Sequence, residues 1–242
     1  MRSAEFLYDG TIEGYLTVIG NCISEKMMPL HIHNEQSRKM TGGGEALRVK
    51  TDTKIADNIY RLIGRRSSPE VQQMVNDIFL TSVPDMEMDL FVMICKAIKH
   101  GAVIAEDYQD EFMKRMQFAI RDLYREAQTI QDQMSIFERD KLAYAMINPR
   151  NKVLPILENR IRKDMRYDDM IIYDKRHRMA YVRFRDESAV IDISRLYGCC
   201  DIDSAEDVYY RLWPYFTGRG GIPSDRNIQN ADALTKLWYV AG

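Results

Sequence analysis

The chain has 242 residues, of which 29% are charged, and 34 basic and 36 acidic residues leave a formal net charge of −2. This length allows one large domain or two small ones with a buried core. The aromatic content of 10% excludes a disordered polyelectrolyte. Because the overall charge is near neutral, nucleic acid could be bound only by a local basic patch and not by the chain as a whole.

The cysteines and the first residues predict a cytoplasmic protein. Cys22, Cys95, Cys199 and Cys200 form no Cys-x-x-Cys pair, which is typical of free thiols in a reducing compartment. Residues 1–6 contain no apolar signal core. The most apolar run, residues 90–98, is about half as long as a segment that crosses a bilayer, so no membrane association is expected.

The first part of the chain is predicted to be mainly helical. A short apolar run at residues 6–8 precedes a turn, and apolar residues from Ile12 to Ile23 then recur at the spacing of a helix packed behind a strand. Residues 27–50 are predicted to be irregular. Further helices are predicted at about residues 52–63, from Ser68-Pro69 onward, at 86–99 and at 107–135.

Two motifs in the segment predicted to be irregular contain residue types found in ligand sites. Residues 41–44 form a glycine-rich turn without the Gly-Lys-Ser/Thr ending of a phosphate loop. His31 and His33 would face the same side of a strand and could share a metal, but no third ligand completes a convincing set. No metal and no cofactor are therefore predicted.

After residue 136 the apolar spacing changes from that of a helix to that of a strand. Strands are predicted at residues 142–147, 170–173, 179–185 and 189–193, with a helix after the break at Asn148-Pro149-Arg150-Asn151. This order predicts an antiparallel sheet with a helix on one face. Ser204 and Asp207 have the spacing of a capping box that begins an aromatic-rich tail.

The predicted fold class is therefore α+β. A mainly helical region with a short N-terminal strand, residues 1–135, would pack beside an antiparallel α+β region with a helical tail, residues 136–242. The alternative is one continuous domain.

A basic strand face near residue 180 is the candidate nucleic-acid site. Strand alternation would direct Ala180, Val182 and Phe184 to the core and leave the opposite face in solvent. The candidate residues are Tyr181, Arg183 and Arg185 on that face, and Lys175, Arg176 and Arg178 in the turn before it. The arginines would position phosphates and the tyrosine would stack on a base. The alternative is an ordinary solvated face, because aspartates lie among these residues.

The sequence leaves open whether the protein is an enzyme. It contains no Gly-x-Ser-x-Gly and no His-Glu-x-x-His motif, and no set of cysteines for an iron–sulfur cluster. Pairs of catalytic carboxylates assemble only in three dimensions, so acid–base catalysis stays an alternative.

Several segments resemble a family of unknown function that is associated with DNA metabolism and DNA repair. They are the opening YDGTIEGYL at residues 8–16, the helical segments at 51–56 and 78–81, the junction NPRNKVLP at 148–155, the hairpin at 171–181, and residues 212–216 and 226–227 of the tail. The end of the chain departs from this pattern: residues 234–238 lack the family's proline, and the chain closes on Ala241-Gly242 instead of an acidic residue.

Members of this family typically accompany, or are fused with, a radical-SAM protein and a uracil-DNA-glycosylase-like domain. The resemblance thus implies a DNA-repair accessory protein that binds DNA, a radical-SAM partner, or both. Arg226 and Asn227, in the segment that resembles the family's tail, join the candidate nucleic-acid-binding residues. Two alternatives stay open: a hydrolase that acts on a damaged base or nucleotide, and a purely structural partner protein.

Overall fold

The structure is a computed structural model of the chain, and it describes residues 2–35, 46–102, 110–161, 166–184, 187–193 and 202–214. It divides into two compact units, residues 1–121 and 122–242. The division falls inside the longest described helix, α5 (Glu111–Gln133), and not after it. Each unit is described in turn.

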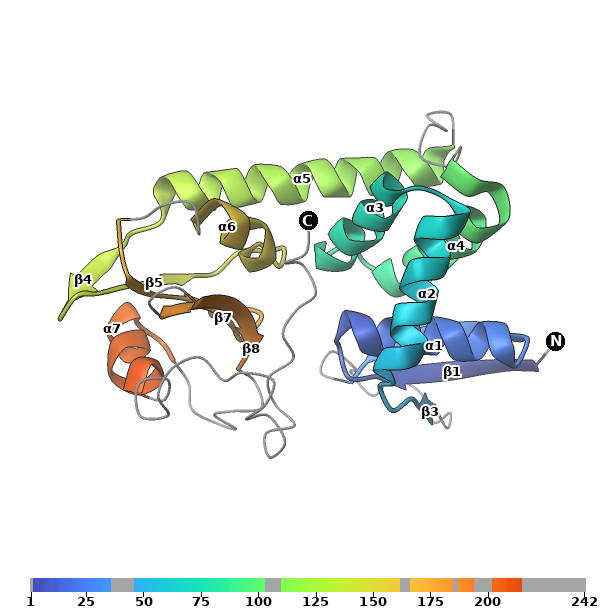
Figure 1. Cartoon of the computed structure of the whole chain (residues 1–242), viewed down its shortest axis with the longest axis horizontal. Coiled ribbons are helices and arrows are strands. Elements are labelled where there is room, and N and C mark those ends of the chain that lie inside the picture. Colours follow the sequence, from blue (N-terminus) through green and yellow to red (C-terminus); the bar gives the residue numbers. More distant parts are fainter. Residues whose placement is uncertain are drawn as a thin grey trace. The chain divides into compact units, whose positions relative to one another are not determined.

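Unit 1 combines a small parallel sheet with helices. Strand β1 (Arg2–Tyr8) continues into α1 (Ile12–Ser24) and then β2 (Met27–Asn34), and the short β3 (Leu47–Arg48) completes a sheet of order β2-β1-β3. Helices α2 (Thr53–Arg66), α3 (Pro69–Leu80) and α4 (Met86–His100) follow. Helix α1 lies along β1 (Figure 1). Both β1 pairs are parallel. For β1 and β2 this is expected, because α1 returns the chain to the same end of the sheet.

The helix boundaries in unit 1 follow from capping chemistry. Ser68 Oγ accepts a hydrogen bond from Val71 N, and Pro69 occupies the first helical position, as the sequence predicted. Gly101 ends α4 with a positive φ of 76°, a conformation that favours glycine. Helix α2 extends beyond its predicted end at about residue 63 and continues to Arg66.

The prediction that residues 27–50 are irregular is wrong for residues 27–34, which form β2. A register shift between Ala4 and Glu5 lets Leu30 slip out of the pairing between β1 and β2. Leu30 and His31 are consequently both exposed, while Pro29 and Ile32 are buried. The simple two-residue alternation that marks a strand is therefore lost from the sequence.

Unit 2 is built on a five-stranded sheet of order β4-β5-β6-β7-β8. Its elements are β4 (Phe137–Arg139), β5 (Leu142–Ile147), α6 (Leu154–Ile161), β6 (Asp169–Asp174), β7 (Met179–Phe184), β8 (Glu187–Asp192), α7 (Ala205–Asp207) and the π-helical turn η2 (Val208–Leu212). Strands β5 and β6 are parallel and the other pairs are antiparallel. The predicted antiparallel sheet is thus a mixed one, because α6 carries the chain across before β6 begins. The α+β class is confirmed.

Both faces of this sheet are covered, not one. Ala180 and Val182 of β7 pack in a cluster with Ile202, Val208 and Leu212, which precede or belong to α7 and η2. Helix α6 contacts β7 and β8 and covers the opposite face of the sheet. Helices α6 and α7 therefore lie on opposite sides of the sheet (Figure 1). Phe184 is half-buried, with its ring 6.0 Å from that of Trp213.

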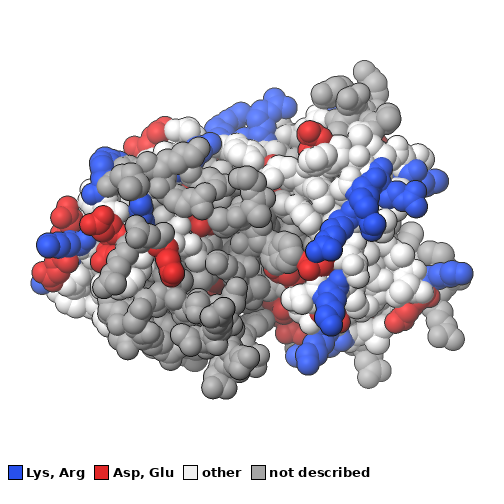
Figure 2. Space-filling model, in the orientation of Figure 1, with Lys and Arg blue, Asp and Glu red and all other residues white. Residues whose placement is uncertain are grey.

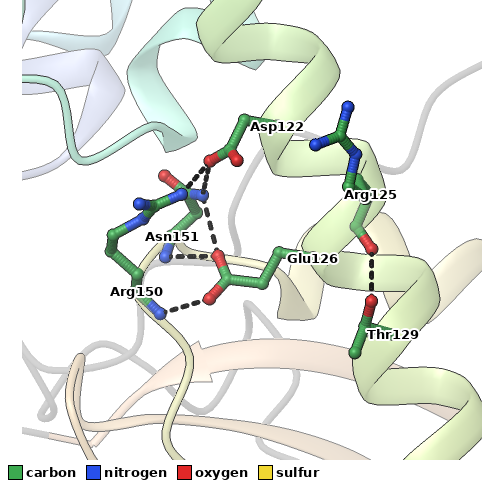
Figure 3. A network of polar contacts seen from close by, with 6 residues as sticks. All are labelled: Asp122, Arg125, Glu126, Thr129, Arg150 and Asn151. Carbon is green, nitrogen blue, oxygen red and sulfur yellow. Dashed lines mark hydrogen bonds and ion pairs between the residues drawn. The ribbon is translucent and has the colours of Figure 1, made fainter.

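A polar junction joins the second half of α5 to the segment before α6 (Figure 3). The Glu126 carboxylate accepts hydrogen bonds from Arg150 N (2.6 Å), Asn151 N (2.9 Å) and Asn151 Nδ2 (2.7 Å). Asp122 pairs with the Arg150 guanidinium. The NPRN segment therefore has a structural explanation. Arg150 and Asn151, its last two residues, donate hydrogen bonds to two carboxylates that lie one helical turn apart on α5.

Candidate nucleic-acid interface

The basic strand face expected on β7 is not in solvent. Tyr181 is fully buried and Arg183 is only 8% exposed. In the β6–β7 register Tyr181 pairs with Ile172, on the face that α6 covers. The interpretation of Tyr181 as an exposed stacking platform is therefore wrong, because a tyrosine and an arginine at alternate positions of a strand do not by themselves indicate a solvated face.

The turn before β7 is organised by its own contacts. Asp174, fully buried, accepts hydrogen bonds from Arg176 N (3.0 Å) and His177 N (3.1 Å), and its second oxygen lies 2.7 Å from His177 Nδ1. Such an Asx-turn fixes a hairpin, so the carboxylate–imidazole pair has a structural role here. Arg176 and Arg178 are exposed, whereas Lys175 pairs with Asp203 (2.7 Å). Arg185, Arg226 and Asn227 lie outside the described residues.

A second basic surface lies on α2. Three exposed cations, Lys54, Arg61 and Arg65, follow one another at helix positions i, i+7 and i+11, with the exposed Asn58 completing the stripe at i+4. Figure 2 shows this band of Lys and Arg side chains over α2. We call Lys54, Arg61 and Arg65 the α2 basic face. It is held outward because Ala56, Ile59 and Ile63 on the other side of the helix are buried in the core of unit 1.

The electrostatics of the α2 basic face favour an external anion. Within the described part of the chain, none of its three cations forms an ion pair with a carboxylate. The nearest acid in sequence to Lys54, Asp52, is the helix N-cap and accepts from Lys54 N (2.9 Å) and Ile55 N (3.2 Å). A phosphate would therefore meet three cations that form no direct ion pair with a described carboxylate.

Helix stability does not explain the whole α2 basic face. Arg65 lies in the last turn of α2, where a cation is favourable to the helix dipole. Lys54 lies in the first turn, where the same dipole disfavours a cation by about 0.3–1 kcal/mol. Its presence is easier to understand if it contributes to binding.

Metal binding by His31 and His33 finds no support in geometry. Their rings share one side of β2 and stack with centroids 5.6 Å apart. Among the residues that the structure describes, no group of three or more His, Cys, Asp or Glu side chains is arranged to hold a metal ion. The expected shared face is present, but the third ligand is not among these residues.

The α2 basic face could have been found from the sequence. Positions 54, 58, 61 and 65 recur at helical spacing on the side of the helix turned away from positions 56, 59 and 63. The signal was a run of basic residues at helical spacing within residues 48–66, a stretch with few acids. The apolar positions alone predict the helix but do not indicate what its exposed side carries.

Comparison with known proteins places the chain without naming a reaction. No described helix combines the length and the hydropathy needed to cross a membrane. No curated protein matches the sequence. A family model described as "Domain of unknown function (DUF4130)" matches residues 84–239, which run from α4 into the tail. Since this match spans more than half of the chain, the protein belongs to the DUF4130 family, and its α2 basic face lies in the N-terminal part before the matched region.

Proposed function

We propose that the protein is an accessory factor of DNA metabolism that binds the sugar–phosphate backbone of nucleic acid through the α2 basic face. The observation that carries this proposal is the alignment of Lys54, Arg61 and Arg65 on one exposed helix face with no carboxylate paired to them among the described residues. Backbone phosphates are the anions that such a row of cations recognises without regard to sequence.

The dimensions of the face suit a polyanion. Lys54 and Arg65 are about three helical turns apart, which is roughly 16 Å along the helix axis. One strand of B-DNA places a phosphate about every 3.4 Å along its axis, so this length corresponds to roughly five nucleotides. A single small anion would use only one of the three cations, whereas a nucleic-acid strand can use all of them.

The resemblance to DNA-repair accessory proteins supports the same proposal. If the protein acts beside a radical-SAM partner, the partner would supply the chemistry and this chain would supply contact with the nucleic-acid backbone. A hydrolase acting on a damaged base would instead need an acid or base in a pocket, and the described Asp174–His177 pair is engaged in fixing a turn.

The test is the salt dependence of binding to a labelled duplex and to a single strand of the same length. A triple variant, Lys54→Gln, Arg61→Gln and Arg65→Gln, should weaken binding to every sequence. Each lost phosphate contact removes about 0.9 from the slope of log K against log salt, so the duplex slope should flatten by about 2–3 units. Fluorescence anisotropy between about 50 and about 200 mM salt covers the useful range.

A control with the same change of charge separates local contact from net charge. Lys99, Lys114 and Arg121 are exposed cations elsewhere in unit 1, and their triple replacement by glutamine should leave the slope close to that of the wild type. Circular dichroism would verify that both variants are folded. The proposal fails if the wild-type chain does not bind at low salt, or if the two triple variants lose affinity equally.

A further inference from the structure

An arginine and four aromatic rings meet in unit 2 at the edge of the five-stranded sheet. The rings form a chain of neighbours: Phe137 to Tyr144 (5.7 Å between centroids), Tyr144 to Tyr209 (5.5 Å) and Tyr209 to Tyr210 (4.9 Å). We call Phe137, Arg139, Tyr144, Tyr209 and Tyr210 the ring cluster. It joins β4 and β5 to η2, elements far apart in the sequence.

The two ends of the ring cluster are open to solvent. Phe137 is 45% exposed and Tyr210 is 55% exposed, whereas Tyr144, between them, is 7% exposed. An aromatic side chain gains free energy by burial, about 25 cal/mol for each Å² removed from water. A fold that buries the middle of a ring chain and leaves both ends exposed retains apolar surface for a ligand.

Arg139 gives the ring cluster a polar, planar component. Its guanidinium carbon lies 5.2 Å from the Tyr209 ring centroid and 5.1 Å from that of Tyr210. Both distances are within the range of a cation–π contact. A guanidinium held against two rings keeps its N–H donors at their edge, where they can meet the acceptors of a stacked heterocycle.

Local backbone geometry presents these side chains. Asp140 and Lys141 form the β4–β5 turn with φ values of 50° and 67°, which are unusual for residues other than glycine. Asp140 accepts a hydrogen bond from the Tyr209 hydroxyl and so holds η2 against this turn. A π-helical turn is uncommon and is often found at functional sites, and here it brings two consecutive tyrosines to one arginine.

From these contacts we infer that the ring cluster binds an unpaired nucleobase of single-stranded nucleic acid, with Tyr210 and Phe137 as stacking surfaces and Arg139 as hydrogen-bond donor. A base offers both features that the ring cluster matches, a flat π-face and edge acceptors. Glu138 and Asp140 beside Arg139 make the site a poor one for phosphate alone. The ligand class rests on the proposed function, but the residues are different ones.

The experiment compares a single strand, a duplex and a strand whose bases have been removed. Tyr210→Ala and Phe137→Ala should each weaken binding to the single strand by roughly 5- to 150-fold, the effect expected for loss of one stacked base. Duplex affinity and the affinity for the abasic strand should not change, because neither offers an unpaired base. Tyr210→Phe retains the ring and should restore single-strand binding.

Phe118→Ala is the matched control, since Phe118 is 61% exposed and lies on α5 in unit 1. It should bind the single strand as the wild type does. Equal single-strand affinity of the wild type, Tyr210→Ala and Phe137→Ala would overturn the inference, and so would an equal loss for the abasic strand. A proline-rich peptide that binds through Tyr210 when these oligonucleotides do not would also overturn it and identify a different occupant.

Failure of this inference can be told apart from failure of the proposed function. If the α2 triple variant loses duplex binding while Tyr210→Ala has no effect on the single strand, only the base site is disproved. If Tyr210→Ala loses single-strand binding while the α2 triple variant matches its control, only the α2 basic face is disproved.

Discussion

Removal of the Glu126 carboxylate should destabilise unit 2. In the Glu126→Ala variant the N–H groups of Arg150 and Asn151 lose their acceptor, and the Asn151 side-chain amide loses the nearer of its two acceptors. Arg150 is exposed, so water can replace the bond to its N–H. Asn151 is only 3% exposed, so water cannot readily replace the bond to its main-chain N–H, and its side-chain amide would keep the longer bond to Asp122 (3.3 Å).

The magnitude follows from the two hydrogen bonds that Asn151 loses. A hydrogen bond to a charged group contributes about 1.5–3 kcal/mol, and its loss at a buried donor is not compensated by water. Allowing for partial relaxation, we expect a loss of about 3 kcal/mol in the free energy of unfolding. For a chain of this size, about 2–4 °C per kcal/mol gives a fall in the midpoint of thermal unfolding of roughly 6–12 °C.

The assay is thermal unfolding followed by circular dichroism, with amide hydrogen exchange at Asn151 as a local readout. Glu111→Ala is the control on the same helix, because its carboxylate is 86% exposed and its partner among the described residues is Lys114 at i+3. Both variants replace a glutamate of α5 by alanine, and the control also removes an acid from the first turn, where the helix dipole favours it, so the control can only reduce the expected difference. An equal midpoint for Glu126→Ala and Glu111→Ala would refute the reasoning.

Two further predictions concern titrating groups. Burial, and then the neighbouring Cys95, raise the pKa of the Cys22 thiol to about 11, so at pH 8 only about a thousandth of the thiol is ionised. Because the thiolate is the reactive form, Cys22 should resist alkylation until the chain unfolds. Peptide mapping by mass spectrometry would measure this. The hydrogen bond from Ser204, and then those from the backbone, lower the pKa of the Asp207 carboxyl in the folded chain. The ionised cap therefore stabilises the fold at pH values above the pKa of this carboxyl in the unfolded chain. This stabilisation is lost as the pH falls through the lower pKa of the folded chain. Ser204→Ala should therefore raise the pKa of Asp207 in an NMR titration, and an unchanged value would contradict the assigned cause.

Much of the local structure is readable from the sequence because it depends on near neighbours. The Ser68-Pro69 start of α3, the Gly101 end of α4 and the Ser204–Asp207 capping box each involve residues at most four positions apart. Strand β5 was likewise recognisable from its composition and its flanking break. These features do not require knowledge of what packs against them.

The errors arise where distant residues decide the outcome. The alternation of Ala180 and Val182 with Tyr181 and Arg183 indicates a half-solvated strand, but α6 buries the second side. Tyrosine and arginine both have long apolar parts, so they do not mark exposure reliably. The parallel pairing of β5 with β6 likewise depends on the crossover through α6.

The two candidate binding surfaces differ in whether their residues lie close together in the sequence. The α2 basic face lies on one helix, so its spacing could have been read directly. The ring cluster joins β4 to η2, and nothing in the local pattern of Phe137 or Tyr210 indicates that they meet through Tyr144 and Tyr209. Such a site can be recognised only after the sheet is assembled.

The hydrogen bond from Tyr209 to Asp140 has a consequence for biosynthesis. At about 5–20 residues per second, a ribosome adds the intervening 69 positions in roughly 3–14 s. During that interval the β4–β5 hairpin has been synthesised but Tyr209 and Tyr210 have not. Phe137 and Tyr144 therefore lack the rings that η2 adds to the ring cluster. The nascent chain would therefore carry an uncovered aromatic edge, a surface that chaperones recognise, until the segment that ends the described part of unit 2 has emerged.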